Sequence, residues 1–265
     1  MCVNAAPSAC FERVFRARVS SACFERVFRA RVSSTVYLAP FILPFLALFI
    51  HLQDVSLTNS PSSGCIKLAE DAGKLNDGHI DVLINNAGAA WGEPFDRTSG
   101  KMNWGFDKIF DLNVKGPFYL THACVPLLKR DHTGSTDNDP GRVINIGSVV
   151  GLNPQDAPTH AYDASKAAIH HLTKKMSTDL SEHNITCNAI APGFVPSKMS
   201  AQLGSYASFE DIAKKTPMKR LGDDDDMAGG AIYLSSKAGA WVTGIILNID
   251  GGAIGGLKIP LASED

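Results

Sequence analysis

The chain has 265 residues, 45% of them hydrophobic and 20% charged, with 23 glycines, 14 prolines and six cysteines. This composition is typical of a globular domain and excludes a disordered chain, a collagen-like repeat and a disulfide scaffold. The formal net charge is −2, and Lys and Arg form no cluster beyond the first 31 residues, which argues against nucleic-acid binding. The cysteines show no C-x-x-C pair and no metal-ligand spacing, so we expect no metal site and a reduced, cytoplasmic compartment.

Residues 1–53 differ from the rest of the chain. They contain no glycine and six Arg against two Glu, a net charge of about +4, whereas the remainder carries about −6. The 13 residues 8–20 are repeated without change at 21–33. Two copies are too short and too few for a solenoid, and their identity is typical of a recent duplication or a wrongly assigned gene start. As an Arg-bearing amphipathic segment they also resemble an organelle-targeting peptide.

An apolar run at residues 36–50 follows the repeat. The 22 residues from Val32 to Gln53 carry no formal charge, which is close to the ~20 residues that span a bilayer. Pro40 and Pro44 interrupt the run, and the upstream Arg residues would place the rest of the chain away from the cytosol. We therefore expect a buried or poorly folded apolar segment, and membrane contact through 36–50 is the less favoured alternative.

From Asp54 onward, short β-branched runs alternate with amphipathic stretches of helical length. Strands that are covered on both faces are apolar nearly throughout, so this pattern predicts β-α-β units on a parallel sheet. The predicted strands are residues 80–86, 141–148, 185–192 and 244–250. The predicted helices are residues 65–76, 103–129, 162–182 and 224–236. We expect one α/β domain over 54–265, preceded by the atypical segment 1–53.

In open α/β sheets, ligands bind at the carboxyl ends of the strands. Polar residues and glycines collect at three of these ends in the predicted sheet: Asn85, Asn86 and Gly88, then Ser148, then Pro192 and Gly193. Because the carboxyl ends of parallel strands lie at one edge, a single clustered site is expected there.

Three side chains at this edge suit the protonation of a carbonyl oxygen. Tyr162 and Lys166 are four residues apart, so they share one face of a helix. A tyrosine with an unperturbed pKa of about 10 is a poor acid or base at neutral pH, and an adjacent ammonium stabilises the phenolate and lowers that pKa. Ser148 can donate a hydrogen bond to the same oxygen. The set predicts an enzyme that protonates a carbonyl oxygen while hydride arrives at the carbon.

The order and spacing of six motifs resemble those of the short-chain dehydrogenase/reductases, a family with a Rossmann-like, doubly wound parallel sheet. The motifs are DVLINNAG (81–88), FDLNVKGPF (110–118), GRVINIGSVVG (141–151), YDASK (162–166), NAIAPGFVPSKM (188–199) and VTGIILNIDGG (242–252). Through PGFVPSKM and WGEPF the chain is similar to β-ketoacyl carrier-protein reductase-like members of the rhamnolipid-synthesis type. The resemblance implies NAD(P)-dependent reduction of a 3-oxoacyl or similar ketone to an alcohol, with NADP as the expected cofactor and NAD as the alternative.

The resemblance also implies roles for single residues. Tyr162 matches the general acid/base, and Lys166 matches the residue that lowers the tyrosine pKa and holds the nicotinamide ribose. Ser148 matches the serine that orients the carbonyl, and Asn113 matches the residue that bends its helix and holds a water relaying protons to Lys166. The implied cofactor contacts are Asp54 and Val55 at the adenine, Asn86, Ala87 and Gly88 beneath the adenosine ribose, and Pro192, Gly193, Val195 and Ser197 at the carboxamide.

The chain departs from the family at its N-terminus. The family opens with a β-α-β unit whose turn, T-G-x-x-x-G-x-G, presents backbone N–H groups to the pyrophosphate. No glycine precedes Gly64, so this unit is missing or replaced. We therefore expect weak NADPH binding, and a catalytically impaired family member is the alternative to an active reductase.

Other expectations concern the substrate, the assembly and the histidines. Loops 151–160 and 194–216 are expected to frame a moderately apolar pocket for a small carbonyl substrate. The family implies a homo-oligomer in which the helices at 103–129 and 162–182 pair across a two-fold axis. His170 and His171 have no Cys or carboxylate at ligand spacing, so we expect both to be structural.

Overall fold

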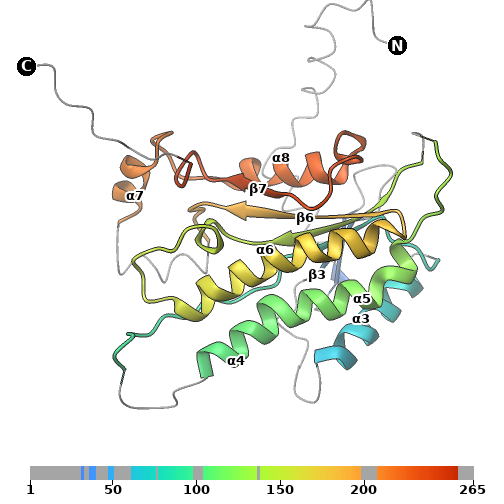
Figure 1. The fold of residues 1–265 in the computed structure, drawn as a ribbon, viewed down its shortest axis with the longest axis horizontal. Helices are drawn as coiled ribbons and strands as arrows, with labels where there is room; N and C mark the ends of the chain where they lie inside the picture. Colours follow the sequence, from blue (N-terminus) through green and yellow to red (C-terminus); the bar gives the residue numbers. More distant parts are fainter. Residues whose placement is uncertain are drawn as a thin grey trace, which may run out of the picture.

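The computed structural model describes residues 31–32, 36–39, 47–50, 61–75, 77–97, 104–135, 138–197 and 208–255. They form a seven-stranded sheet with helices on both faces (Figure 1). The strands are neighbours in the order β1-β2-β3-β4-β5-β6-β7. The strands are β1 (Arg31–Val32), β2 (Val36–Ala39), β3 (Ala47–Ile50), β4 (Val82–Asn85), β5 (Gly141–Ile146), β6 (Ile185–Pro192) and β7 (Ile246–Ile249).

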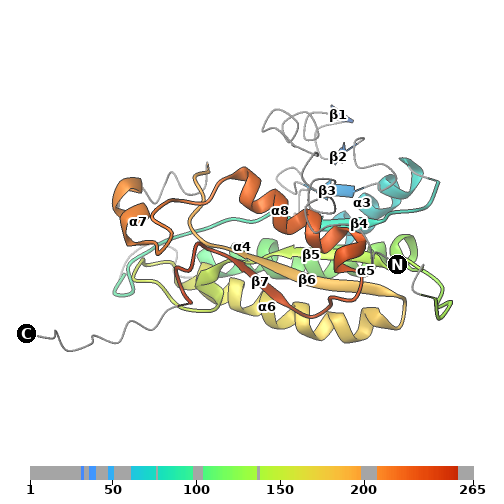
Figure 2. The same ribbon diagram turned by 90° about the horizontal axis from the view of Figure 1, so that it is seen from above.

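Helices of the described residues form the two outer layers. The principal helices are α3 (Pro61–Leu75), α5 (Gly116–Leu128), α6 (His160–Ser181) and α8 (Asp224–Ser235). The shorter pieces are α4 (Trp104–Phe110), a π turn (Asp111–Lys115) that joins α4 to α5, a 3₁₀ turn (Val149–Gly151), α7 (Phe209–Lys215) and a second 3₁₀ turn (Lys237–Gly239). Figure 2 shows α8 on one side of the sheet and α5 and α6 on the other.

The α/β fold predicted from the sequence is confirmed. β3 to β7 run parallel to one another, and β4 to β7 lie within the four predicted strand ranges. The predicted helix at 103–129 comprises α4, the π turn and α5, so one amphipathic stretch carries an internal irregularity that its periodicity did not indicate. The short helix α7 was not predicted, because seven residues are too few to show a period.

Alternate residues of β4 pack against opposite helical layers, which explains why this strand is apolar throughout. Leu83 belongs to a cluster with buried residues of α3, α5 and α6. Val82 and Ile84 belong to a second cluster with Leu234 of α8. Successive side chains of a strand point to opposite faces, so a strand between two layers is apolar at every position.

The apolar run 36–50 supplies two strands to the same sheet. β3 lies beside β4 in parallel register, from Ala47 opposite Val82 to Ile50 opposite Asn85. β2 pairs antiparallel with β3, and β1 pairs antiparallel with β2. An antiparallel pair is not a β-α-β unit, in which a crossover joins two parallel strands. The place beside β4 is therefore filled by a strand whose outer neighbour runs in the opposite direction.

Two expectations for the N-terminal fifth relate to this arrangement. No helix in the described part of the chain is both long and apolar enough to cross a membrane. The repeat at residues 8–33, apart from β1, and the expected boundary between residues 53 and 54 lie outside the described residues. The division of the chain into 1–53 and 54–265 stays a prediction.

Candidate active site

The three candidates for carbonyl protonation meet where β5 ends and α6 begins. Ser148 follows β5 by two residues, and Tyr162 and Lys166 lie in the first two turns of α6. The Ser148 side chain hydrogen-bonds the Tyr162 hydroxyl. Lys166 Nζ lies 5.6 Å from the centroid of the Tyr162 ring. Residues that are up to 18 positions apart in the sequence thus share one site.

Lys166 holds its ammonium at the carboxyl end of β5. Its Nζ donates to the carbonyl oxygen of Ile146 at 2.7 Å, and the side chain is 6% exposed. Burial disfavours the charged amine and lowers the Lys166 pKa from 10.5 to about 8. Lys166 is therefore mainly protonated at pH 7 and loses its proton at mildly alkaline pH.

We expect Lys166→Met to raise the free energy of unfolding at pH 7 by about 2 kcal/mol, because it removes a buried charge at the cost of one hydrogen bond. The penalty for burying the ammonium is fully present below pH 8, where folded and unfolded chains both carry the proton. It declines as the pH rises from about 8 to 10.5, where the unfolded chain loses its proton too. Urea unfolding of both proteins at pH 7 and pH 10 checks this. A stability difference that does not shrink with pH would contradict it.

The Tyr162 pKa is raised, and the expectation that the Lys166 ammonium lowers it is not met. Burial of the phenol is the largest effect, the Asp163 carboxylate adds to it, and the hydrogen bond with Ser148 opposes it. Lys166 Nζ donates to Ile146 and lies over the face of the ring, so desolvation decides the direction. Tyr162 is consequently a neutral phenol at pH 7, which suits a proton donor.

Asn113 connects the end of β4 to α6 from the π turn. It is 3% exposed, and its Oδ1 accepts from Ala89 N at 2.9 Å. Its Nδ2 donates to Ala89 O at 3.0 Å and to Ser165 Oγ at 2.9 Å. Asn113 lies within the π turn, where the helix is irregular, and the expected bend stays a prediction. The water relay to Lys166 stays a prediction.

Ser165 was not among the residues predicted from the sequence, although it stands inside the YDASK motif. It is fully buried, and its Oγ donates to the carbonyl oxygen of Tyr162 at 2.7 Å while accepting from Asn113. This chain of hydrogen bonds joins the π turn to the backbone of Tyr162. The sequence feature that could have indicated Ser165 is a small hydroxyl residue directly before Lys166.

The segment after β4 approaches Lys166 closely. Asn86, Ala87 and Gly88 follow the last residue of β4, with Asn86 exposed at the edge and Ala87 buried. A Cβ at Gly88 would lie 3.2 Å from Asn113 Oδ1 and 3.7 Å from Lys166 Nζ. Glycine at this position therefore leaves open the space directly before the ammonium.

The end of β6 lies next to the end of β5 in the sheet. Gly193 N donates to Ile249 O at 2.9 Å, and a Cβ at Gly193 would lie 2.7 Å from Asp250 Cα, so the chain there packs directly on the end of β7. Pro192 ends β6, and Val195 and Ser197 follow within the described chain. Asp54 and Val55 lie outside the described residues, as do residues 198–207 of the expected substrate loop.

These residues fit one half of a nicotinamide dinucleotide. A hydroxyl at Tyr162, an ammonium at Lys166 and a backbone without Cβ at Gly88 suit the hydroxyls of a ribose. The pyrophosphate half has no such fit, because no glycine precedes Gly64 and the described strands β2 and β3 are antiparallel. Among the described residues, no group of three His, Cys, Asp or Glu side chains could hold a metal ion.

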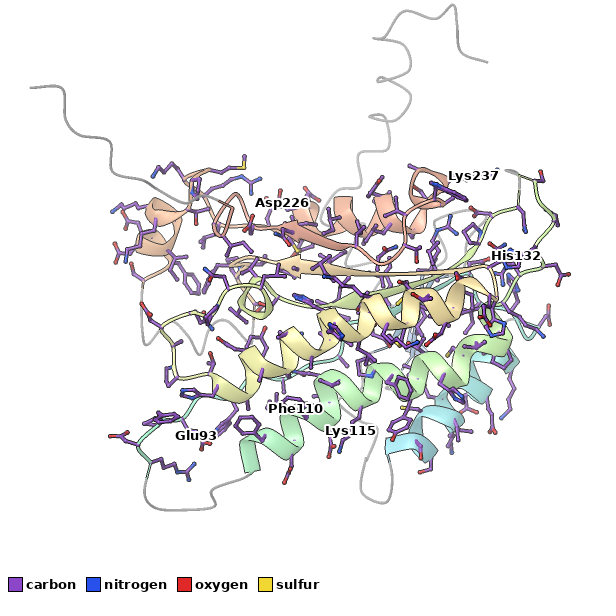
Figure 3. The ribbon with its side chains drawn as sticks, in the orientation of Figure 1. Glu93, Phe110, Lys115, His132, Asp226 and Lys237 are labelled. Carbon is purple, nitrogen blue, oxygen red and sulfur yellow. The ribbon has the colours of Figure 1, made fainter. Side chains whose placement is uncertain are left out.

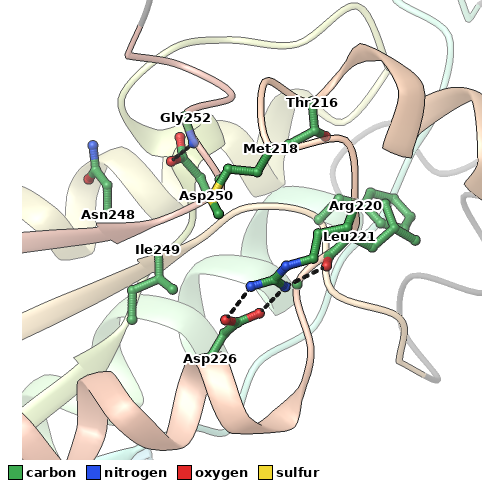
Figure 4. A pocket seen from close by; sticks show the side chains of 12 residues that line it. Thr216, Met218, Arg220, Leu221, Asp226, Asn248, Ile249, Asp250 and Gly252 are labelled. Carbon is green, nitrogen blue, oxygen red and sulfur yellow. Dashed lines mark hydrogen bonds and ion pairs between the residues drawn. The ribbon is translucent and has the colours of Figure 1, made fainter.

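A cavity of about 330 Å³ lies past the end of β7, beside Phe194 and Asp250 (Figure 4). Arg220 crosses it and donates to both carboxylate oxygens of Asp226, at 2.6 and 2.8 Å. This ion pair lowers the Asp226 pKa to about 2. Because the guanidinium charge is already compensated, the cavity is not an anion site. Asp226 also closes a capping box with Asp223, so part of the acidic run 223–226 caps the N-terminus of α8.

Comparisons with known proteins identify relatives of the chain. The family profile described as enoyl-(acyl carrier protein) reductase matches residues 61–253. The rhamnolipids biosynthesis 3-oxoacyl-[acyl-carrier-protein] reductase of Pseudomonas aeruginosa is 37% identical over 201 residues, which is 76% of each chain. The 7alpha-hydroxysteroid dehydrogenase of Escherichia coli is 33% identical over 177 residues, 67% of this chain and 65% of that protein.

Solved structures extend the likeness to the fold. The Pseudomonas aeruginosa RhlG/NADP active-site complex has a TM-score of 0.65 at 36% identity and covers 72% of this chain and 73% of its own. A 7 alpha-hydroxysteroid dehydrogenase complexed with NADH and 7-oxo glycochenodeoxycholic acid has a TM-score of 0.61 at 32% identity, with 74% and 72% covered. With its sheet and its Ser-Tyr-Lys-Asn set, the chain therefore belongs to the short-chain dehydrogenase/reductase family of NAD(P)-dependent oxidoreductases.

Proposed function

We propose that this chain reduces a ketone, of 3-oxoacyl or similar type, to an alcohol with NADPH as the hydride donor. The observation that carries the proposal is the hydrogen-bonded pair Ser148–Tyr162 with the Lys166 ammonium over the tyrosine ring. It is supported by the Pseudomonas relative, whose name is that of a 3-oxoacyl reductase and whose solved complex contains NADP.

We also infer a cytoplasmic location. The thiols of Cys65, Cys124 and Cys187 are free and buried, which suits a reducing compartment.

In the proposed reaction, Ser148 and Tyr162 hold the carbonyl oxygen between their hydroxyls. NADPH, when bound, supplies the hydride to the carbonyl carbon. Tyr162 donates its proton to the oxygen, so a C–H and an O–H bond replace the π bond of the carbonyl, the C–O single bond remains, and the tyrosine is left as a phenolate. Lys166, protonated at pH 7, stabilises that negative charge. Asn113 and Ser165 keep Tyr162 in place through its backbone carbonyl.

The alternative is a family member that keeps the proton-transfer residues but cannot hold its cofactor. It is favoured by the absence of glycine before Gly64 and by the antiparallel pairing of β2 with β3. NADPH oxidation by the full chain with a 3-oxoacyl ester, followed as a function of NADPH concentration, separates the two. Turnover that rises with NADPH without saturating supports the reductase with weak cofactor binding. A chain with no turnover at any concentration is the impaired member.

We also infer a homo-oligomer that assembles through the outer face of α4 and α5. Phe106, Phe118 and Tyr119 are 46%, 38% and 36% exposed there, a set of aromatic side chains that is costly to leave in water. Figure 3 shows Phe110 and Lys115 marking the junction of α4, the π turn and α5 that bears this face.

We expect Phe118→Glu to lower the molecular mass in solution to that of the monomer, because a two-fold axis brings like charges together. Light scattering on the full chain checks this. Met218→Glu, which changes a 62% exposed residue outside this face, is the control and should keep the wild-type mass. A wild-type protein that is already monomeric, or a Phe118→Glu oligomer, would contradict the assignment.

A further inference from the structure

Two side chains one turn apart on α6 hold the end of β5. Lys166 Nζ donates to Ile146 O at 2.7 Å, and His170 Nε2 accepts the backbone N–H of Ser148 at an N···N distance of 3.4 Å. The His170 side chain is 4% exposed. The two contacts lie on either side of Gly147, so they fix the backbone of Ser148 relative to Lys166.

The glycines of the GSVVG motif make this contact possible. A Cβ at Gly147 would overlap His170 Nε2, and Gly147 cannot withdraw because its N–H donates to Ile190 O at 2.7 Å. A Cβ at Gly151 would lie 2.5 Å from the carbonyl carbon of Lys166. Both glycines are therefore required because α6 packs directly on the segment that carries Ser148.

The protonation state of His170 suits an acceptor. A ring nitrogen that accepts a hydrogen bond carries no proton, so this contact requires a neutral ring that carries its proton on Nδ1, a buried atom with no hydrogen-bond partner among the described residues. Burial and the Lys166 ammonium lower the His170 pKa to about 4, and Lys174 acts in the same direction. Both charged neighbours come from α6, and the Gly151 carbonyl opposes them. A protonated ring would instead direct an N–H at the N–H of Ser148.

We propose that His170 is a positioning residue, whose imidazole holds the Ser148 backbone and thereby directs the Ser148 hydroxyl toward Tyr162 and the substrate oxygen. The proposal rests on the proposed ketone reduction. It goes beyond the expectation that His170 is merely structural, because the contact is to the residue that touches the substrate. Without an acceptor, the Ser148 N–H is buried unpaired, and the end of β5 must shift to reach another partner.

The first test compares two substitutions of His170 in the full chain. His170→Leu removes the acceptor, whereas His170→Gln offers an amide oxygen to the same N–H and does not titrate. We expect His170→Leu to lower kcat about 10-fold with little change in KM, and His170→Gln to recover most of that loss. His171→Leu, at the exposed neighbouring position, is the matched control and should behave as wild type. A loss of kcat in His170→Gln as large as that in His170→Leu would overturn the proposal.

A second test separates positioning from a general loss of structure. In the Ser148→Ala background, the hydroxyl that His170 positions is absent, so His170→Leu should cause no further loss of kcat. A purely structural effect would lower kcat by the same factor in both backgrounds, and that result would refute the positioning role.

A third measurement does not depend on turnover, so failure of the proposed function remains distinguishable. Nitrogen-15 NMR of the histidine rings of the full chain at pH 7 should show His170 protonated on Nδ1 only. Amide exchange at Ser148 should be faster in His170→Leu than in His170→Gln. A proton on Nε2, or equal exchange in both variants, would overturn the assignment whether or not the enzyme is active.

Discussion

Tyr162→Phe is expected to lower ketone reduction by about 1,000-fold or more while leaving the fold intact. The change removes the hydroxyl that hydrogen-bonds Ser148 and that gives its proton to the carbonyl oxygen in the proposed reaction. General acid catalysis by a positioned side chain contributes about 100- to 10,000-fold. The ring stays in place, so stability should fall by only about 1 kcal/mol for one lost hydrogen bond. NADPH oxidation with a 3-oxoacyl ester gives the rate, and thermal unfolding gives the stability.

The matched control is Tyr233→Phe, which makes the same chemical change at a 41% exposed position on α8. Its rate should equal that of the wild type. Equal rates for Tyr162→Phe and the wild type would remove Tyr162 from the mechanism. The pH dependence adds a second check: Lys166 loses its proton above about pH 8 and can then no longer stabilise the phenolate, so reduction should decline through that pH.

Replacing residues 1–53 with a family β-α-β unit that contains T-G-x-x-x-G-x-G is expected to raise NADPH affinity by at least about 100-fold. Each backbone hydrogen bond to a charged phosphate contributes about 1.5–3 kcal/mol, and two such bonds suffice for this factor. The wild-type chain has no glycine before Gly64 with which to build the turn. The graft also replaces β1, β2 and β3, and it offers a parallel strand to β4 in place of β3.

Fluorescence titration of NADPH against the two full-length proteins measures the effect. The control is the same graft with the three glycines of the turn changed to alanine, which keeps the helix and strand while a Cβ blocks approach of the pyrophosphate. This control should bind as weakly as the wild type. Micromolar or tighter binding by the wild-type chain would show that residues 1–53 build a pyrophosphate site without the glycine turn.

Much of the site could be predicted from the sequence because its chemistry depends on local spacing and on strand ends. Tyr162 and Lys166 are one helical turn apart in any helix, and Ser148 follows a strand that is apolar nearly throughout. The first fact places Tyr162 and Lys166 on one helix face, and the second places Ser148 at the carboxyl edge of a parallel sheet. The family motifs then assigned Asn113 and the glycines of the strand ends by position.

Contacts between distant segments could not be predicted in this way. Asn113 contacts Ala89 and Ser165 from a π turn, and helical periodicity does not reveal one extra residue in a turn. His170 had the same sequence signature as His171, yet packing buries the first against Ser148 and leaves the second exposed. Side chains on one helix are distinguished by what lies opposite, which is a property of the assembled layers.

The sequence by itself determined the fold class, through alternating strand and helix patterns, and the absence of glycine before Gly64. It predicted the proton-transfer set from residue types at short spacing. Only the tertiary structure decided the direction of the Tyr162 pKa, because burial of the phenol outweighs its hydrogen bond with Ser148, while the Lys166 ammonium donates to Ile146. It also decided how the sheet is completed beside β4. A four-residue apolar strand can pair with either neighbour and in either direction, and the pairing of β3 with β4 depends on an edge that residues 82–85 present only when folded.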